Sequence, residues 1–385
     1  MKKRIAVIGR GTAGSQAVIH FLRHQTDCEI QWYFDDNIPP QTVGEGATLS
    51  LPQSLFENIN FNYQDLDKID ATIKLGIYKE GWGKGDAFYH DFVPPTCGLH
   101  FNAVALQEYI SEQVTGKVEK IVKHVDSDCS DVDADYIMDC RGKPKSYDEF
   151  NKSKYIPVNA AYVTQCEWEY PKFQYSLTIA RPYGWVFGIP LKNRCSIGYL
   201  FNRNINTLDE VKDDVCNIFE QYDLTPSDNT NYLEFENYYR KQNYTDRVVY
   251  NGNTSFFLEP LEATSIYLMH VIQRNAFDLW NGNMILDEAL FNYRVAVHEI
   301  ETMIMMHYCA GSKYDTPFWA YAQDRGEQSI RNAMSGDLSF VSAVKKAKDM
   351  RGENDQRYYG DYGIWSYPSM YQNIRGLNLN ERLWV

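Results

Sequence analysis

The sequence predicts an α/β fold in which a Rossmann-like nucleotide-binding module is interwoven with a second module of antiparallel strands and helices. Residues 4–34 read as a strand, a glycine-rich turn, a helix and a second strand. Residues 155–201 read as a run of short strands separated by turns, and residues 263–280 and 286–309 read as two long helices. Neither an internal repeat nor a low-complexity linker separates these parts, so we expect modules that interleave along the chain.

The first module follows the order of a parallel nucleotide-binding sheet. RIAVIG at residues 4–9 is a β-rich run that ends in glycine, and residues 13–23 have the apolar spacing of a helix. CEIQWYF at residues 28–34 is the next strand. A further amphipathic helix is expected over residues 103–114, and a strand over residues 136–140 that leads into a tight turn.

The second module has a different pattern of predicted secondary structure. Within residues 155–201, four segments alternate with turns and predict an antiparallel sheet. A helix is expected over residues 208–222, and residues 248–257 return to a strand and a turn. The long helices at 263–280 and 286–309 have apolar faces, whereas the tail from residue 350 is rich in Tyr, Gly and Asn and is expected to be loop-like.

Amino-acid composition indicates which kinds of partner and which cellular compartment to expect. The net charge of −13 disfavours nucleic acid and anionic membrane surfaces as partners. No stretch approaches the roughly 18 apolar residues of a membrane span. The eight cysteines are scattered without a CxxC pair, which is typical of reduced thiols in a cytoplasmic protein. Aromatic residues make up 15% of the chain, which suits a pocket for a planar ligand but also an ordinary large core.

The turn GRGTAG matches GxGxxG between a strand and a helix. Gly9 allows the tight turn, Gly11 lets the backbone approach a pyrophosphate, and Gly14 lets the helix pack closely on the strand. Thr12 and Ala13 begin the helix, whose N-terminus carries a partial positive charge toward the phosphates. The turn therefore predicts a dinucleotide site.

An acid that binds the ribose is expected about 20 residues after such a turn. Asp35 and Asp36 follow the second strand, and either could serve; we choose Asp35, the alternative being a pair of solvated loop aspartates. The glycine turns at residues 136–142 and 250–253 favour FAD over NAD, since late turns of this kind return to the flavin in hydroxylase-type flavoproteins.

The stretch FFLEPLEATSIY at residues 256–267 places two glutamates in an apolar run at the entrance to a helix. Helix capping is the simplest explanation, because a negative charge at a helix N-terminus contributes up to about 1 kcal/mol. The alternative is that Glu262 faces a reaction, while Glu259, held extended before Pro260, is structural.

Taken together, these segments resemble the flavin-dependent halogenases of the tryptophan-halogenase type. The resemblance covers roughly residues 4–320. It is carried, in chain order, by GRGTAG at 9–14, VGEGATLSL at 43–51, ATIKLGIYKEGW at 71–82, FYHDF at 88–92, LHFNA at 99–103, DCRG at 139–142, GWVFGIPL at 184–191 and GNTSFFLEPLEATSIY at 252–267.

The sequence departs from the family pattern at four positions. Arg10 stands in place of a third glycine, Arg141 in place of a small residue, Phe187 in place of a second tryptophan, and Ser265 in place of glycine. The C-terminal region is also short, which puts free tryptophan as the substrate in doubt. The short chain resembles a compact, more open halogenase of the kind found in phage-like genomes.

The resemblance implies a catalytic pair. Lys74, within a strand-like run over residues 72–78, would deliver hypohalous acid, either by hydrogen bonding or as a haloamine, whereas Lys79 is expected at the surface. Glu262 would face Lys74 across the site and take the proton lost from the ring. The amides of Thr264 and Ser265 would hold the halide, and the Thr264 hydroxyl can cap the helix.

The resemblance also implies ligand contacts. His90 and Phe92 would flank the aromatic substrate, and Trp185 would shield the flavin, although a core position suits Trp185 almost equally. The remaining implied FAD contacts are Glu45, Ala47, Leu261 and Ile266. His298, Glu299 and His307 share a helix without forming HExxH, so no metal site is expected.

The resemblance implies that the cofactor is FAD and that a separate reductase supplies it as FADH2. Together with O2 and a halide ion, it would act on a small electron-rich arene. A homodimer is compatible with the family. We expect a discontinuous FAD-binding module, of the flavin monooxygenase type, at residues 1–60, 97–150 and 245–285, and a substrate module at residues 61–96, 151–244 and 286–385. Two alternatives stay open: a flavin monooxygenase that hydroxylates an aromatic substrate, and a flavin-binding protein without turnover.

Overall fold

The computed structural model describes residues 2–39, 45–83, 85–92, 96–355, 357–380 and 382–383. It divides into two compact units, each assembled from three stretches of the chain. The first unit comprises Met1–Ala71, Leu99–Lys152 and Tyr238–Val297, and the second comprises Thr72–Gly98, Ser153–Asn237 and His298–Val385.

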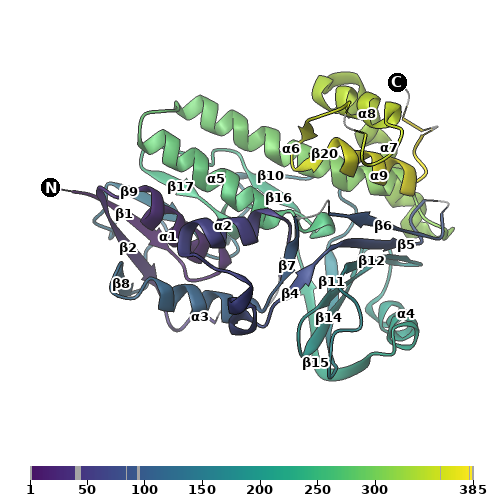
Figure 1. Cartoon of the computed structure of the whole chain (residues 1–385), viewed down its shortest axis with the longest axis horizontal. Coiled ribbons are helices and arrows are strands. Elements are labelled where there is room, and N and C mark those ends of the chain that lie inside the picture. Colours follow the sequence, from purple (N-terminus) through teal and green to yellow (C-terminus); the bar gives the residue numbers. More distant parts are fainter. Residues whose placement is uncertain are drawn as a thin grey trace. The chain divides into compact units, whose positions relative to one another are not determined.

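The first unit is built on a five-stranded parallel sheet (Figure 1). Its strand order is β17-β9-β1-β2-β8. The strands are β1 (Lys3–Ile8), β2 (Cys28–Phe34), β8 (Glu119–Val122), β9 (Tyr136–Asp139) and β17 (Val248–Tyr250). All four pairings in the sheet are parallel. The predicted Rossmann-like sheet is therefore confirmed, and because its strands are parallel, their carboxyl ends lie at one edge.

The central strand β1 is buried on both faces, as its apolar run IAVI indicates. Helix α1 (Thr12–His24) buries Ala17, Val18 and Phe21. The other helices of this unit are α2 (Ser50–Ile59), α3 (Ala103–Gln113), α5 (Ser265–Trp280) and the first part of α6 (Leu286–Ala310). The short elements are η1 (Tyr63–Ile69), η2 (Gly252–Thr254), η3 (Leu261–Ala263), a pairing of β3 (Gly46–Ala47) with β7 (Gly98–His100), and a small sheet of β10 (Phe150–Lys152), β16 (Tyr238–Arg240) and β18 (Phe256–Phe257).

The second unit is built on a seven-stranded sheet of order β15-β11-β14-β13-β12-β5-β6. The strands are β5 (Gly76–Glu80), β6 (Ala87–Asp91), β11 (Ala160–Glu167), β12 (Ser176–Arg181), β13 (Gly184–Pro190), β14 (Arg194–Phe201) and β15 (Thr225–Glu234), and the short β4 (Thr72–Lys74) precedes β5. The antiparallel sheet predicted within residues 155–201 is confirmed. One parallel pairing, β5 with β12, adds residues 76–80 to that sheet.

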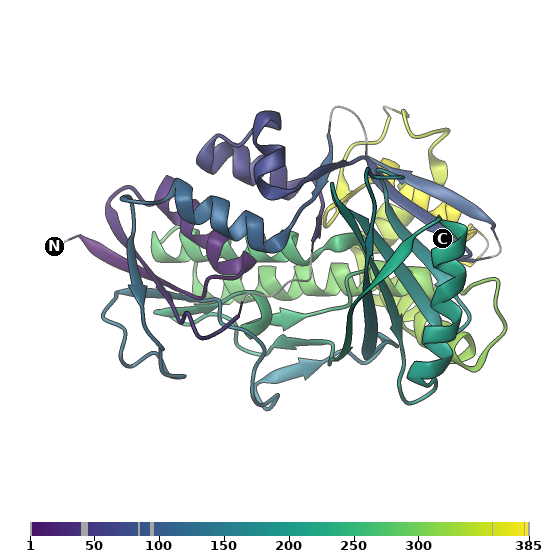
Figure 2. The same cartoon turned by 90° about the horizontal axis from the view of Figure 1, so that it is seen from below.

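Helix α4 (Leu208–Gln221) runs along one face of this sheet (Figure 2). Its residues Val211, Val215 and Ile218 recur at helical spacing and pack with Val186 and Ile197 of the sheet. A Thr207 and Glu210 capping box starts the helix, which explains the close agreement between its predicted and observed N-terminus.

The C-terminal region holds three helices: α7 (Pro317–Gly336), α8 (Leu338–Asp349) and α9 (Tyr367–Gly376), with a hairpin of β19 (Asp361–Tyr362) and β20 (Trp365–Ser366). The expectation of a loop-like tail was wrong. Ser366 caps α9 by accepting from the Ser369 N–H, and Pro368 lies in the first turn, so the local start signal outweighs the Tyr, Gly and Asn content. Among the described residues, none of the helices is both long and apolar enough to cross a membrane.

Candidate active site

The glycine turn lies at the carboxyl edge of the parallel sheet, between β1 and α1. Gly9 has φ +106°, and a Cβ there would lie 2.6 Å from the Cys140 carbonyl oxygen. A Cβ on Gly14 would lie 2.0 Å from the Gly9 oxygen. A Cβ on Gly11, in contrast, would meet nothing within 4 Å. Two glycines are therefore required by packing, whereas the third borders open space at the N-terminus of α1.

The two late turns lie beside the glycine turn. A Cβ on Gly252, which has φ +61°, would lie 2.7 Å from the Ala13 Cβ. The Asn251 N–H and the Thr254 hydroxyl both donate to the Asp139 carbonyl, each at 2.8 Å. Thus the turns after β1, β9 and β17 meet at one edge of the sheet, around the first turn of α1.

Asp35 follows β2 at this same edge. Its carboxylate accepts from the Asn37 backbone N–H and side-chain N–H, each at 2.9 Å, and lies 3.0 Å from His124 Nδ1. The backbone hydrogen bond from Asn37 is the main reason that the pKa of Asp35 lies below its ordinary value. Asp36 instead pairs with Arg10 at 3.1 Å.

The two arginine departures each have a structural explanation. Arg10 lies over the Phe34 ring, 4.9 Å from its centre, while it pairs with Asp36. Arg141 donates to both carboxylate oxygens of Asp139 and to the carbonyls of residues 125–127. Arg141 thereby ties the turn after β9 to the loop after β8.

The other predicted cofactor contacts lie in the first unit. Glu45 is buried and its carbonyl accepts from the Phe101 N–H at 2.9 Å, while Ala47 pairs with Leu99. Leu261 and Ile266 are buried around the start of α5. The first two residues of the quoted VGEGATLSL stretch lie outside the described residues.

Glu262 lies in a strained turn. Glu262 and Ala263 have φ values of +69° and +55°, so two consecutive non-glycine residues adopt the left-handed region. Such conformations cost about 1–3 kcal/mol each and concentrate at functional sites. Glu262 is 4% exposed and Glu259 is fully buried. Neither glutamate lies in the first turn of α5, which contains no acidic residue, so the simple capping explanation does not apply.

The helix after this turn begins at Ser265, with Thr264 as the N-cap. Its backbone ladder starts with the Leu268 N–H, which donates to the Thr264 carbonyl at 3.1 Å. The preceding amides therefore point out of the helix end, as an anion site requires. The expected hydroxyl cap is absent: the Thr264 side chain makes no capping hydrogen bond, because Thr264 already has helical dihedral angles.

Lys74 lies in the second unit at the end of β4. The predicted strand-like run breaks at Leu75, whose N–H donates to the Gln174 carbonyl and whose carbonyl accepts from the Phe92 N–H. The Lys74 side chain is fully buried, and its Nζ lies 5.6 Å from the centre of the Phe92 ring. Burial of an ammonium group is costly unless interactions within the protein offset the lost hydration.

His90 lies next to Phe92, with ring centres 6.0 Å apart. His90 is 3% exposed, and its Nε2 lies 2.5 Å from Ser369 Oγ of α9. The structure therefore brings Lys74, Phe92 and His90 together in the second unit.

The expectation that Lys79 lies at the surface was wrong. Lys79 is 1% exposed, and its Nζ lies 2.7 Å from His307 Nε2 and 2.5 Å from Asn373 Oδ1. Pairing of β5 with β12 on one side and β6 on the other places β5 inside the sheet rather than at its edge. The burial of Lys79 is thus a consequence of tertiary structure that local sequence does not report.

Trp185 is 1% exposed, within an aromatic cluster of the second unit. Its ring centre lies 6.4 Å from that of Trp82, which in turn contacts His307 and Trp319 edge-on. Phe187, two residues on, lies across Gly198 of β14, where a Cβ would be 2.1 Å from the ring. Within the described residues, no group of three or more His, Cys, Asp or Glu side chains could hold a metal ion.

Comparison with known proteins supports one family. The family model described as tryptophan halogenase matches residues 4–133 and 102–359 of the chain. The chain belongs to the tryptophan halogenase family. It is therefore a flavin-dependent halogenase, an oxidoreductase, and the family implies a flavin cofactor, O2, halide, a separate flavin reductase and an aromatic substrate.

The individual relatives have low sequence identity to this halogenase, but the alignments cover nearly its whole length. Tryptophan 7-halogenase RebH of Lentzea aerocolonigenes is 25% identical over 98% of this chain and 89% of its own length. Among solved structures, a tryptophan halogenase from Shewanella frigidimarina has a TM-score of 0.78 at 17% identity, covering 99% of this chain and 92% of its own. Xcc4156 of Xanthomonas campestris, a flavin-dependent halogenase, has the same TM-score and identity over 98% and 89%.

The first unit of the halogenase fits the FAD that the family implies. A Cβ on Gly11 would meet nothing within 4 Å, whereas Gly9 and Gly14 on either side have no room for a side chain, so a pyrophosphate could approach the backbone at Gly11. Gly9, Gly11 and Gly14, with Thr12 and Ala13 at the helix start, would hold the phosphates.

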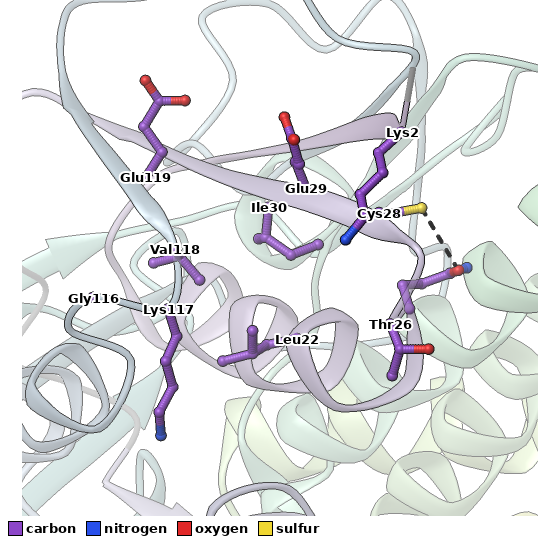
Figure 3. A pocket seen from close by; sticks show the side chains of 11 residues that line it. Lys2, Leu22, Thr26, Cys28, Glu29, Ile30, Gly116, Lys117, Val118 and Glu119 are labelled. Atoms are coloured by element: carbon purple, nitrogen blue, oxygen red, sulfur yellow. Dashed lines mark hydrogen bonds between the residues drawn. The ribbon is translucent and has the colours of Figure 1, made fainter.

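A separate cavity of about 490 Å³ lies at the opposite edge of the same sheet (Figure 3). It is lined by the amino ends of β1, β2 and β8, the end of α1 and residues 116–117. Ligands of doubly wound sheets bind at the carboxyl edge, so this cavity is not the dinucleotide site. Its Cys28 thiol approaches Gln25 at 3.8 Å, and burial raises its pKa, which makes it a poor nucleophile.

The C-terminal helix α9 was missed by the sequence analysis. Its Ser369 and Asn373 contact His90 and Lys79, which come from strands almost 300 residues earlier. The Ser366 cap with Pro368 two residues later was the local signal that could have revealed the helix. No local signal could have revealed its partners.

Proposed function

We propose that this halogenase converts chloride, bromide or iodide to hypohalous acid and that Lys74 delivers the acid to an electron-rich arene of the indole or phenol type. The observation that supports this most directly is the fully buried Lys74 ammonium beside the Phe92 ring and His90. Reduced flavin with O2 supplies the oxidising equivalent when it is bound. The protein must hold the halide, exclude water, and position the reagent and the ring.

Lys74 would hold the reagent in one of two ways. As an ammonium, it donates a hydrogen bond to the oxygen of hypohalous acid and polarises the oxygen–halogen bond. As a neutral amine, it forms a nitrogen–halogen bond and releases water, which gives a haloamine. In both cases the aryl carbon gains the halogen, and the ring must then lose a proton.

Glu262 would accept that proton. A carboxylate fixed by a strained turn and almost fully buried loses little orientational freedom, so it can act as a general base in one position. Its negative charge would also stabilise the cationic ring that forms when halogen adds.

Thr264 and Ser265 would bind the halide through their backbone amides at the start of α5. Ser265 adds a side chain where the family pattern has glycine, so it is a candidate for tuning halide preference. Larger halides lose less hydration energy on burial and are easier to oxidise, which favours bromide and iodide beside chloride.

The remaining assignments follow the same proposal. Residues 1–60, 97–150 and 245–285 would form the FAD-binding module, with Asp35 on the ribose and Glu45, Ala47, Leu261 and Ile266 as further contacts. Residues 61–96, 151–244 and 286–385 would form the substrate module, where His90 and Phe92 flank the arene and Trp185 shields the flavin. The eight free cysteines are consistent with a cytoplasmic enzyme that receives flavin from a separate reductase, and we leave the homodimer as a proposal.

The test supplies chemically or enzymatically reduced FAD, one halide at a time, and a panel of indoles, phenols and tryptophan, with product masses as the readout. Lys74→Ala should lower halogenated product at least about a hundredfold while oxygen consumption by reduced flavin continues. Lys345→Ala, an exposed lysine on α8, is the matched control and should leave the product yield unchanged. Glu262→Gln should lower the yield comparably, and the double variant should cost little more than either single change.

Two results would contradict the proposal. Hydroxylated product without halogen would indicate an aromatic monooxygenase, the alternative function. Unchanged halogenation in Lys74→Ala would remove Lys74 from the mechanism while leaving the family assignment intact.

A further inference from the structure

Arg10 lies within the glycine turn, between Gly9 and Gly11, at a position where the family pattern has glycine. Its guanidinium carbon lies 4.9 Å from the centre of the Phe34 ring, and its Nη1 lies 3.1 Å from an oxygen of Asp36. A guanidinium this close to a ring centre is attracted to the face of the ring. The Arg10 side chain therefore extends from the glycine turn to the end of β2.

The turn and the end of β2 are fixed relative to each other by hydrogen bonds. The Gly9 N–H donates to the Tyr33 carbonyl at 2.8 Å, and Trp32 Nε1 donates to the Gly9 carbonyl at 2.9 Å. The Ser15 hydroxyl of α1 donates to the Arg10 carbonyl at 3.1 Å. Both the backbone of Arg10 and the strand that its side chain reaches are thus held in place.

An adenine nucleotide bound to a sheet of this type spans the same two places. Its pyrophosphate lies at the glycine turn, and its ribose lies at an acid that follows the second strand. Here Gly11 leaves the backbone of the turn open, and Asp35 is the acid proposed for the ribose. Arg10 is adjacent to Gly11, and its guanidinium contacts Phe34 and Asp36, the residues on either side of Asp35.

The guanidinium of Arg10 offers a flat face rather than a free charge. The Asp36 carboxylate offsets its positive charge, and Phe34 covers one face of its plane. The Arg10 side chain nevertheless remains 38% exposed. Planar guanidinium groups stack on the flat faces of nucleobases, and a group already held in position loses little conformational entropy when a ligand binds.

We propose that the exposed face of the Arg10 guanidinium stacks on the adenine ring of FAD, with Phe34 supporting its other face. The inference rests on the proposed FAD site at the glycine turn. It makes Arg10 a residue that determines cofactor specificity, because FAD and ADP carry the adenine ring whereas FMN does not. The adenosine half of FAD would then be recognised by a side chain at a position where the family pattern supplies only backbone.

The experiment measures the binding of ADP and FMN to the flavin-free protein by calorimetry, and the binding of FAD by flavin fluorescence. Arg10→Ala should weaken ADP and FAD binding about five- to tenfold and leave FMN affinity within about twofold. Arg10→Lys keeps the charge but loses the plane, so it should weaken ADP binding nearly as much as Arg10→Ala. Arg23→Gln, an exposed change in the last turn of α1, is the matched control and should keep the wild-type affinities.

Two results would overturn the inference. Wild-type ADP affinity in Arg10→Ala would show that Arg10 only links the turn to β2, and wild-type ADP affinity in Arg10→Lys would show that charge, not stacking, matters. Should Arg10→Ala fail to fold, Arg10→Lys still decides, because lysine can retain the pairing with Asp36. Failure of the proposed FAD site would appear differently, as a wild type that binds neither ADP nor FAD, and failure of the proposed reaction as FAD binding without halogenated product.

Discussion

The glycine turn of the first unit is built from backbone, whereas a buried cluster of the second unit is built from side chains. We call this cluster the α9 network; it consists of Lys79, His90, His307, Ser369 and Asn373. In the turn, the backbone forms the site: Gly9 and Gly14 contact each other so closely that a side chain on Gly14 would lie 2.0 Å from a carbonyl oxygen. In the α9 network, side chains form the site: Lys79, His307 and Asn373 come from three distant segments and hydrogen-bond in the interior.

This difference determines what the sequence can reveal. A site made of backbone requires glycine at fixed local spacing, because a single Cβ would block it, and the pattern is visible in six residues. A site made of distant side chains imposes no local pattern. A lysine in a strand reads as a surface residue until the strand is known to be internal to a sheet.

The largest effect should come from adding a methyl group to the turn. Gly14→Ala places a Cβ against the Gly9 carbonyl, so α1 must move away from β1. We expect a loss of about 3–5 kcal/mol in the free energy of unfolding, measured by urea denaturation, and loss of FAD binding. Gly336→Ala, where a Cβ meets nothing within 4 Å, is the control and should leave stability unchanged or slightly raised.

Gly11→Ala separates folding from cofactor binding at the same turn. Its Cβ meets no protein atom, so we expect stability within about 0.5 kcal/mol of the wild type but a clear fall in FAD affinity. Equal effects of Gly11→Ala and Gly14→Ala on stability would show that the turn does not depend on the close contact that distinguishes them.

The α9 network should respond to loss of its buried charge. Lys79→Met keeps most of the side-chain volume but leaves His307 Nε2 and Asn373 Oδ1 without their donor. Because each unsatisfied buried acceptor costs about 1–3 kcal/mol, we expect a loss of about 2–4 kcal/mol in the free energy of unfolding. Lys345→Met, an exposed change, should alter stability by less than about 0.5 kcal/mol. A neutral or stabilising Lys79→Met would mean that the charge is a net cost at this position.

The same contrast explains which predictions from sequence succeeded. Residues 28–34 were predicted as a strand with the observed bounds, because their β-branched and aromatic run between polar turns has no competing structure. Helix α4 was found because Thr207 and Glu210 mark its start. The pairing of β5 with β12 could not be predicted, since nothing in residues 76–80 indicates a partner a hundred residues later.

The candidate site residues also fall into two groups, those with a local sequence pattern and those without one. The glycines were identified from local spacing, and their roles follow from the contacts that a Cβ would make. Lys74 and Glu262 came only from family resemblance, because an isolated lysine or glutamate carries no chemical signature. The burial of Lys74 and the left-handed backbone of Glu262 are physical reasons for singling them out, and both require the three-dimensional structure.

Buried polar side chains also lie close to the glycine turn, on the helix that follows it. Helices α1, α2 and α5 enclose a polar cluster that the sequence did not predict: Gln16 Oε1 accepts from His270 Nε2 and from the Ser54 hydroxyl, each at 3.3 Å. Burial lowers the pKa of His270 to about 3, and burial together with nearby positive charge lowers that of His20 to about 3. Side-chain hydrogen bonds therefore join α1, the helix that begins at the glycine turn, to α2 and α5.

These histidines predict a pH dependence with a defined sign. In the unfolded chain they bind protons below about pH 6.5, whereas in the folded chain they stay neutral down to about pH 3. The unfolded state thus gains protons first, and stability is lost as pH falls from about 6.5 toward 3. One pH unit below 6.5, at pH 5.5, each histidine should cost about 1.4 kcal/mol relative to neutral pH.

His270→Gln should flatten this dependence, because glutamine can still donate to Gln16 Oε1 but takes up no proton. Urea denaturation between pH 5 and 8 measures the slope. His124→Gln is the matched control, since its side chain is 73% exposed. If the wild type and His270→Gln lose stability in parallel on acidification, then the burial of His270 does not cause the pH dependence.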